Sequence, residues 1–339
     1  MNPASTTTPA PGRIPALVLV FLAPLLAEVL PGATRLSSLF VFPIEMCVWG
    51  GGALLIREAA RRWGLGWRNV LCLALALSVA EECIIQQTSL APMVIQIKGQ
   101  VYARAFGVNY VYFLWALAYE TVFVVFLPIQ LAELIFPRWR GEPWLGRVGL
   151  IVTPVLFLAG SFLAWFSWTQ IARTKVFHQP AFNPPLLAVA AASVAIIGLV
   201  FTAVGPYRAW VARASSPLPP PAPRTLGVAG GLWAVPLYGL VLLGFGLAPA
   251  FPPALAVAGG GALVAAALFT VPRWSAHPAW DQRHGFGIVF GTLLGAMLVS
   301  FVGFIGAARM DLYFKIIADV AAVGFFLVLG RRFRPASAT

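Results

Sequence analysis

Long apolar segments alternate with short polar ones along the whole chain. Apolar segments of about 18 residues or more are typical of helices that cross a bilayer, since the hydrocarbon core takes about 20 residues to span. The pattern predicts an all-α, polytopic transmembrane helical bundle of about ten spans. The expected spans are residues 14–31, 38–60, 67–90, 109–136, 147–172, 185–205, 227–247, 252–271, 285–307 and 312–330.

Composition supports a membrane protein. Of the 339 residues, 60% are hydrophobic and only 10% are charged, whereas a soluble domain carries about 25% charged residues. The formal net charge of +12 would suggest a nucleic acid partner in a soluble protein. Here the basic residues lie between apolar segments, so membrane topology explains them and no nucleic acid partner is expected.

The distribution of basic residues predicts the orientation. With ten spans, 16 of the 23 Lys and Arg residues lie on the same side as the N-terminus and 7 lie on the opposite side. Cytoplasmic loops carry an excess of Lys and Arg, so we expect both termini in the cytoplasm and the protein in the cell membrane. The sequence does not indicate an oligomeric state.

A proline-rich segment divides the chain into two groups of spans. We expect a disordered cytoplasmic tail over 1–13, a six-span bundle with buried acids over 14–214, and a cytoplasmic linker over 215–226 that contains SSPLPPPAPR. Stiffness is typical of a proline-rich linker. A four-span bundle over 227–330, rich in the small residues that let helices pack closely, and a basic tail over 331–339 complete the chain.

Acidic residues gather at one depth of the predicted bundle. An ionised carboxylate near the middle of a bilayer costs a few kcal/mol or more, so such residues generally face a polar cavity and mark ion or proton pathways. We expect a carboxylate-lined cavity in the outer half of the membrane. Its acids are Glu28, Glu45, Glu81, Glu82, Glu120 and Asp319, and Gln86 and Gln87 add polar groups.

Glu81 and Glu82 are adjacent and cannot both face the same point, because neighbouring residues on an α-helix point about 100° apart. We expect Glu82 to face the cavity together with Gln86, one turn further along, and Glu81 to face a neighbouring helix. The alternative to a place in the cavity is, for each acid, a structural role in which its side chain pairs with a group on a neighbouring helix. Three other acids, Glu58, Glu133 and Glu142, lie near arginines at cytoplasmic helix ends and are expected to form surface ion pairs.

No metal site or cofactor is predicted. Cys47, Cys72 and Cys83 lie in apolar segments without metal-ligand spacing and are expected to pack as small hydrophobic residues. The segment HPAWDQRH places His277 and His284 on either side of Trp280 and an aspartate. This segment is better interpreted as a polar loop with an interfacial tryptophan than as a metal site.

The Glu-Glu pair resembles a motif of the CPBP family, the CAAX-processing and bacteriocin-processing intramembrane proteases. That family carries EExxxR on one helix, FxxxH on a later helix, and a further His followed by Asn or Asp. Here Glu81 and Glu82 match the pair, Gln86 occupies the Arg position, and Glu120 in YFLWALAYETV occupies the polar place of the missing His. The resemblance implies a glutamate-activated water that cleaves a peptide bond near the membrane, with Glu82 as base and Glu81 orienting it.

Three functions therefore remain open. The first is a divergent CPBP-like protein that acts on a membrane peptide, with or without catalytic activity. The second is a proton- or cation-coupled transporter or permease that uses the same acids for a cation or small molecule. The third is a membrane scaffold subunit in which the acids only join helices.

Overall fold

The computed structural model describes residues 12–92, 102–211, 216–242, 248 and 250–333. The described chain is an all-α bundle, as predicted, with a single two-stranded hairpin formed by β1 (Arg104–Ala105) and β2 (Val108–Asn109). Residues 1–11 and 334–339 of the expected tails, and residue 215 of the expected linker, lie outside the described residues.

Helices form most of the N-terminal part. In chain order these are α1 (Ile14–Pro24), η1 (Leu25–Val29), η2 (Leu36–Val41), α2 (Phe42–Glu45), η3 (Met46–Gly50), α3 (Gly51–Trp63), α4 (Trp67–Ala80), η4 (Glu81–Ile85), α5 (Tyr110–Tyr119), η5 (Glu120–Phe126), α6 (Leu127–Ile135), η6 (Pro137–Trp139), α7 (Arg147–Trp165), η7 (Phe166–Val176), α8 (Leu186–Val204) and α9 (Arg208–Val211).

The C-terminal part contains α10 (Pro223–Leu242), α11 (Pro253–Ser275), α12 (Gln282–Ser300), η9 (Phe301–Phe304) and α13 (Arg309–Arg331). Helix α10 begins at Pro223, inside the expected linker. Proline suits the first turn of a helix because its missing N–H would have no partner there. Residues 223–226 of the expected linker are therefore helical.

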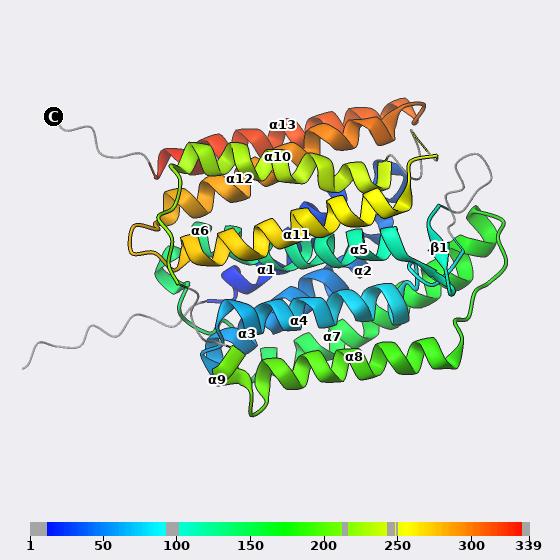
Figure 1. Ribbon diagram of the computed structural model, residues 1–339, viewed down its shortest axis with the longest axis horizontal. Coiled ribbons are helices and arrows are strands. Elements are labelled where there is room, and N and C mark those ends of the chain that lie inside the picture. Colours follow the sequence, from blue (N-terminus) through cyan, green and yellow to red (C-terminus); the bar gives the residue numbers. More distant parts are fainter. Residues whose placement is uncertain (1–11, 93–101, 212–215, 243–247, 249, 334–339) are drawn as a thin grey trace, which may run out of the picture.

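Seven helices of the described chain are long and apolar enough to cross a membrane. They are Leu36–Trp63, Tyr110–Ile135, Arg147–Val176, Leu186–Val204, Pro253–Ser275, Gln282–Phe304 and Arg309–Arg331, and a shorter apolar helix spans Ile14–Val29. Figure 1 shows α4 and α10 lying along the same axis as these helices. Since all these helices satisfy their own backbone hydrogen bonds, the arrangement suits a bilayer.

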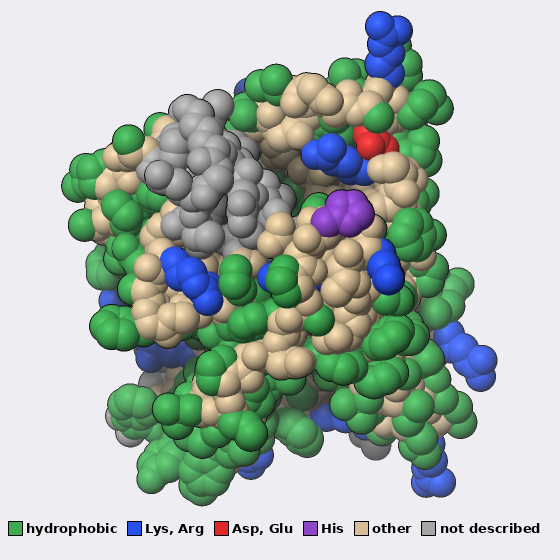
Figure 2. All heavy atoms as spheres, turned by 90° about the vertical axis from the view of Figure 1, so that its right-hand side faces the viewer, with side chains coloured by type: hydrophobic (Ala, Val, Ile, Leu, Met, Phe, Trp, Pro, Cys, Tyr) green, Lys and Arg blue, Asp and Glu red, His purple; other side chains and the backbone are tan. Residues whose placement is uncertain are grey.

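Burial separates central helices from peripheral ones. About half of the apolar window is buried in Leu36–Trp63 and in Tyr110–Ile135, against 11% in Leu186–Val204 and in Pro253–Ser275. The central helices pack around α1, and the apolar outer faces of α8 and α11 remain for lipid. Figure 1 shows β1 at one end of the bundle and α9 at the opposite end, and Figure 2 shows the β1 end, where scattered basic side chains lie among hydrophobic ones.

Small residues bring α10 and α12 unusually close. A Cβ atom added to Gly291 would lie 1.8 Å from the carbonyl oxygen of Gly227, and one added to Gly295 would lie 2.7 Å from that of Gly231. Both pairs repeat at a spacing of four residues, which is the small-xxx-small pattern of close membrane helix contacts. The predicted packing role of glycine in the C-terminal spans is therefore confirmed for this pair of helices.

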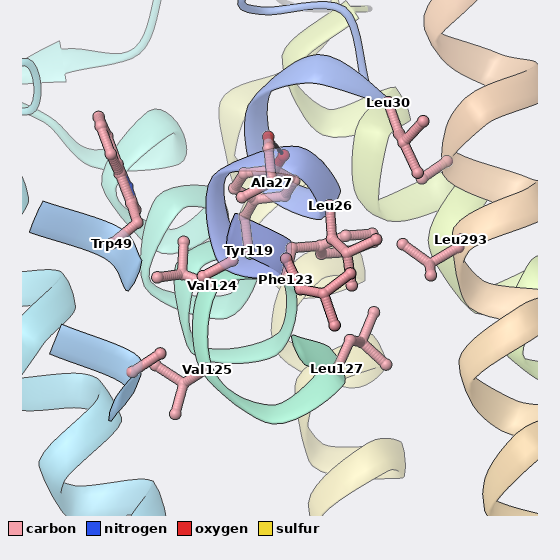
Figure 3. Packing of buried hydrophobic residues seen from close by; sticks show 14 of the residues in the cluster. Leu26, Ala27, Leu30, Trp49, Tyr119, Phe123, Val124, Val125, Leu127 and Leu293 are labelled. Carbon is pink, nitrogen blue, oxygen red and sulfur yellow. Dashed lines mark hydrogen bonds between the residues drawn. The ribbon is translucent and has the colours of Figure 1, made fainter. Parts of the chain in front are cut away.

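The N-terminal and C-terminal groups of helices share one core. Helices α10 and α11 contact α5, and α12 contacts α6. Leu293 of α12 belongs to the same buried cluster as Leu26 of η1 and Phe123 of η5. Figure 3 shows these side chains together, with η1 and η5 lying against each other around Ala27 and Tyr119.

Candidate functional site: a cluster of five glutamates

Five of the acids predicted to share a cavity lie close together inside the bundle. Glu28 interacts electrostatically with Glu45, Glu81 and Glu82, and Glu120 interacts with Glu81, Glu82 and Glu28. The carboxyl groups of Glu81, Glu82, Glu45 and Glu120 are all buried, and Glu28 is half-buried. We call these five residues the glutamate cluster.

Four of these glutamates lie in π-helical segments, and the fifth directly precedes one. Glu28 lies within η1, Glu45 directly precedes η3, Glu81 and Glu82 open η4, and Glu120 opens η5. The wider turn is visible in backbone hydrogen bonds between residues five apart, such as Leu30 N to Leu25 O at 2.9 Å and Gln86 N to Glu81 O at 2.8 Å. π-helical turns are rare, and they occur frequently at functional sites.

Local sequence accounts for part of this winding. Pro24 immediately precedes η1, and Pro128 lies in the first turn of α6, directly after η5. Proline lacks the backbone N–H, so Pro128 interrupts the regular ladder of hydrogen bonds on its N-terminal side, where η5 lies. Before η4 the Ser78 hydroxyl donates to the Ala74 carbonyl at 3.0 Å, a contact that often bends helices.

Close approach of α1 and η3 holds two of the glutamates near each other. A Cβ atom added to Gly50 would lie 2.2 Å from the carbonyl oxygen of Val20. Val20 is four residues before Pro24, so its carbonyl has lost the usual intrahelical partner. Only glycine leaves room for this contact, and it brings the segments that carry Glu28 and Glu45 together.

Glu82 and Glu120 form the centre of the cluster. Their buried carboxyl groups lie close enough to interact directly, and Ser89 donates its hydroxyl to Glu82 Oε2 at 2.6 Å. An ionised carboxylate only accepts hydrogen bonds, so two carboxyl groups can bond to each other only when one of them carries a proton. The pair is therefore a candidate for sharing one proton.

Glu45 and Glu81 retain free hydrogen-bonding capacity. Glu45 accepts a short hydrogen bond from the Thr34 hydroxyl through Oε1, and its Oε2 has no partner. Neither carboxyl oxygen of Glu81 has a hydrogen-bond partner, although the residue is only 2% exposed. Buried polar atoms without partners are costly, so they mark a place where a proton, a water or a ligand fits.

Glu81, which was expected to face a neighbouring helix, interacts with Glu45 at the end of α2 as well as with Glu82. Both members of the Glu-Glu pair therefore belong to the cluster. They have different neighbours there, since Glu82 faces Ser89 and Glu120. The cluster extends across several helices, and adjacent residues can therefore reach different parts of it.

Gln86 and Gln87 lie at the end of η4, beside the cluster. Gln86 is half-buried. Gln87 has a φ of 59° and its amide donates to the Ile84 carbonyl at 3.2 Å. Gln87 lines an open groove of about 340 Å³ between η4 and α7, together with Ile84, Ile85, Ser161, Phe162 and Trp165.

Asp319 does not join the glutamate cluster. It pairs with Lys315, one turn away on α13, and Lys315 also donates to the carbonyl oxygens of Leu30 and Met297. The ammonium group lies 4.7 Å from the centre of the Phe301 ring. Sequence reasoning missed Lys315, although its spacing of four residues from Asp319 is the signal of an ion pair on one helix face.

Two of the three acids at the opposite end of the bundle are buried, which corrects the expectation of surface pairs for these two. Glu133 is 6% exposed and accepts from Arg57 at 3.1 Å and from Arg61 at 2.5 Å. Arg57 also donates to three backbone carbonyls of the segment after α6 and lies 3.2 Å from the Trp144 ring centre. A buried charge is costly unless it is paired and hydrogen-bonded, and these contacts meet that requirement.

Glu58 has a similar role. It accepts from Arg62 at 2.7 Å and from the backbone N–H groups of Trp144 and Leu145. Of the three acids expected at surfaces, only Glu142 is exposed. These buried ion pairs and hydrogen bonds hold the segment after α6 against α3. They lie outside the glutamate cluster.

The histidines flanking Trp280 have a structural role at the start of α12. Asp281 accepts from the backbone N–H groups of Arg283 and His284, and the Trp280 and His284 rings stack 5.4 Å apart. Among the residues that the structure describes, no three His, Cys, Asp or Glu side chains are placed to hold a metal ion.

Comparison with known proteins adds no assignment. The chain matches no protein-family model, and no curated protein or solved structure matches it. Function must therefore be argued from the site itself.

Proposed function

We propose that the protein is a proton- or cation-coupled transporter or permease in which the glutamate cluster binds and releases protons. The observation that carries this proposal is the close approach of the buried Glu82 and Glu120 carboxyl groups. Two carboxyl groups that share a site exchange protons as a pair. Carboxyl chains of this kind inside a membrane bundle are typical of proton relays.

The charge around the cluster supports proton binding. The ion pairs found among the described residues involve other acids, namely Glu58, Glu133, Asp281 and Asp319. An unpaired buried carboxylate is expensive, so protons or a cation from solution are needed to neutralise the five glutamates.

In this proposal the chain crosses the membrane ten times, and both of its termini lie in the cytoplasm. The seven long apolar helices supply seven of these spans, and Ile14–Val29, α4 with η4, and α10 supply the other three. The bias of 16 to 7 basic residues then places the α9 end in the cytoplasm and the β1 end outside. The glutamate cluster lies in the outer half of a cell-membrane protein.

A CPBP-like intramembrane hydrolase is the second candidate. Two carboxyl groups that share one proton are also the machinery of aspartic proteases, so Glu82 and Glu120, with Glu81 nearby, would activate water. The substrate would be a membrane peptide that reaches the site through the groove beside Gln87. Hydrolysis also needs donors for the developing oxyanion. The Gln86 and Gln87 side chains would serve as these donors. They match the role less well than the Arg and His of the CPBP motifs, so the hydrolase is ranked second.

Proton flux into liposomes tests the proposal. Purified protein is reconstituted with a pH-sensitive dye inside, and an outward K⁺ gradient with valinomycin drives proton entry. We expect entry with the wild type, its loss in Glu82→Gln and Glu120→Gln, and wild-type behaviour in Glu142→Gln, whose side chain is exposed. Equal flux in all four proteins would overturn the proposal. Cleavage of a membrane peptide by wild type and not by Glu82→Gln would favour the hydrolase.

A further inference from the structure

Aromatic side chains of α5 line up beside the glutamate cluster. Tyr112, Trp115 and Tyr119 recur every three or four residues and so share one face of the helix. The Trp115 and Tyr119 rings stack 4.6 Å apart, and Tyr112 lies 5.4 Å from Trp115. Tyr238 of α10 packs edge-on against Trp115 at 6.1 Å and against Tyr119 at 5.6 Å.

The aromatic group and the glutamate cluster adjoin each other. Tyr112 interacts electrostatically with Glu82, Glu120, Glu28 and Glu81. Tyr238 likewise interacts with Glu28. The carboxyl groups and the aromatic rings therefore form two walls of one region within the bundle.

The side chains of both walls are mostly buried. Glu81 and Glu120 are only 2% and 7% exposed, and Glu28, Tyr112 and Trp115 are half-buried.

Polar atoms in the two walls lack partners. Both carboxyl oxygens of Glu81 and the indole N–H of Trp115 are buried without a hydrogen bond. Buried polar groups are nearly always hydrogen-bonded, so each exception calls for an unseen water, ion or ligand. Acceptors on one wall and a donor on the other suit a small polar ligand held between them.

We propose that this region binds a small organic ammonium ion, held by Glu28 and Glu81 on one side and by Tyr112, Trp115 and Tyr238 on the other. The inference rests on the proposed function and names the class of its substrate. Carboxylates attract the positive charge, and aromatic walls attract ammonium groups through the negative faces of their rings.

An ammonium ion suits the region better than a metal ion does. Divalent cations need several oxygen ligands converging at about 2.0–2.6 Å, and no three acidic side chains of the described chain are placed in that way. Aromatic rings offer a metal ion no ligand, whereas they add to the affinity of an organic cation with exposed C–H groups.

Two probes test the proposal: methylammonium, as a small primary amine, and choline, as a quaternary one. Each is titrated by equilibrium dialysis against the purified wild-type protein in detergent, beside the neutral carbon isostere of choline. We expect saturable binding of at least one cation and none of the isostere. We also expect weaker binding at lower pH, because protons compete for the carboxylates.

Matched variants locate the site. Trp115→Leu is expected to weaken binding about 10-fold, and Glu81→Gln to abolish it. Trp210→Leu, an exposed tryptophan of α9, should bind as the wild type does. Thermal unfolding of each variant identifies any that fail to fold, and Tyr238→Phe, which keeps the ring, should retain binding.

The outcomes separate this inference from the proposed function. Binding of neither cation, with proton flux intact in liposomes, overturns the ammonium site and leaves proton coupling standing. Equal binding of choline and its neutral isostere, or equal binding by wild type and Glu81→Gln, also overturns it. Loss of both cation binding and proton flux in the wild type contradicts both proposals.

Discussion

The buried carboxyl groups of Glu82 and Glu120 lie close together where η4 and η5 begin, and Ser89 donates a hydrogen bond to Glu82. Both glutamates belong to π-helical segments, as does Glu28. A wider turn changes the direction of a side chain relative to a regular helix. The π-helical turns are therefore a structural means of bringing carboxyl groups from separate helices into contact.

The carboxyl pair predicts a difference between two substitutions at Glu120. Glutamine keeps a hydrogen bond to Glu82, so Glu120→Gln should change the free energy of unfolding by about 1 kcal/mol or less. Leucine removes that bond from a buried carboxyl group, and Glu120→Leu should cost about 2–3 kcal/mol. Thermal unfolding in detergent measures both. Equal losses in the two variants would show that the hydrogen bond is unimportant.

The contact between α10 and α12 predicts a steric effect. In Gly291→Ala the new methyl group would lie 1.8 Å from the Gly227 carbonyl oxygen, so the helices must separate, at a cost of about 1–3 kcal/mol. Gly261→Ala in α11 is the matched control, because a Cβ atom there meets nothing within 4 Å. The two variants are compared by their unfolding temperatures, and similar values would contradict the close packing of these helices.

The buried ion pair at the α9 end predicts a large loss of stability. Glu133→Gln leaves Arg57, which is 1% exposed, without its carboxylate. Removing one partner of a buried pair costs about 3–5 kcal/mol. Glu142→Gln, at an exposed side chain, should be neutral. Limited proteolysis should also cut Glu133→Gln faster in the segment that Arg57 holds, and unchanged cleavage would argue against this fastening role.

The cap of α12 predicts a dependence on acid. Burial alone would raise the pKa of Asp281, but hydrogen bonds from Arg283 and His284 outweigh it and lower the pKa from 3.8 to about 2. A lowered pKa in the folded protein stabilises it above the ordinary pKa, and this contribution is lost as the pH falls from about 4 to about 2.

Asp281→Asn isolates this charge because asparagine still caps a helix. We expect the wild type to be the more stable protein at pH 6 and the two to converge toward pH 2. An advantage that stays constant over this range would show that the charge of Asp281 contributes nothing.

Much of the bundle could be predicted from the sequence. Apolar segments identified the helices, and positions within them put Glu28, Glu45, Glu81, Glu82 and Glu120 at one depth, where the structure brings them together. The abundance of small residues in the C-terminal part indicated close helix packing, and the contact of Gly291 with Gly227 confirms it.

Rotation about the helix axes could not be predicted. Asp319 shares the predicted depth of the glutamates, yet it faces Lys315. The depth of a residue in the membrane follows from counting residues along its span. The direction in which its side chain points depends on the winding of every turn before it, and π-helical turns change that direction. The hydrogen bond from Ser89 to Glu82 joins a loop to a helix and has no sequence signal.

The most direct test of a proton shared by Glu82 and Glu120 is infrared spectroscopy of the purified protein at neutral pH, following the C=O stretch of protonated carboxyl groups. We expect such a band, its shift in D₂O, and its reduction in Glu82→Gln and Glu120→Gln but not in Glu142→Gln. Absence of the band in the wild type, or the same band in all four proteins, would contradict a proton held between Glu82 and Glu120 and leave the glutamates a structural role.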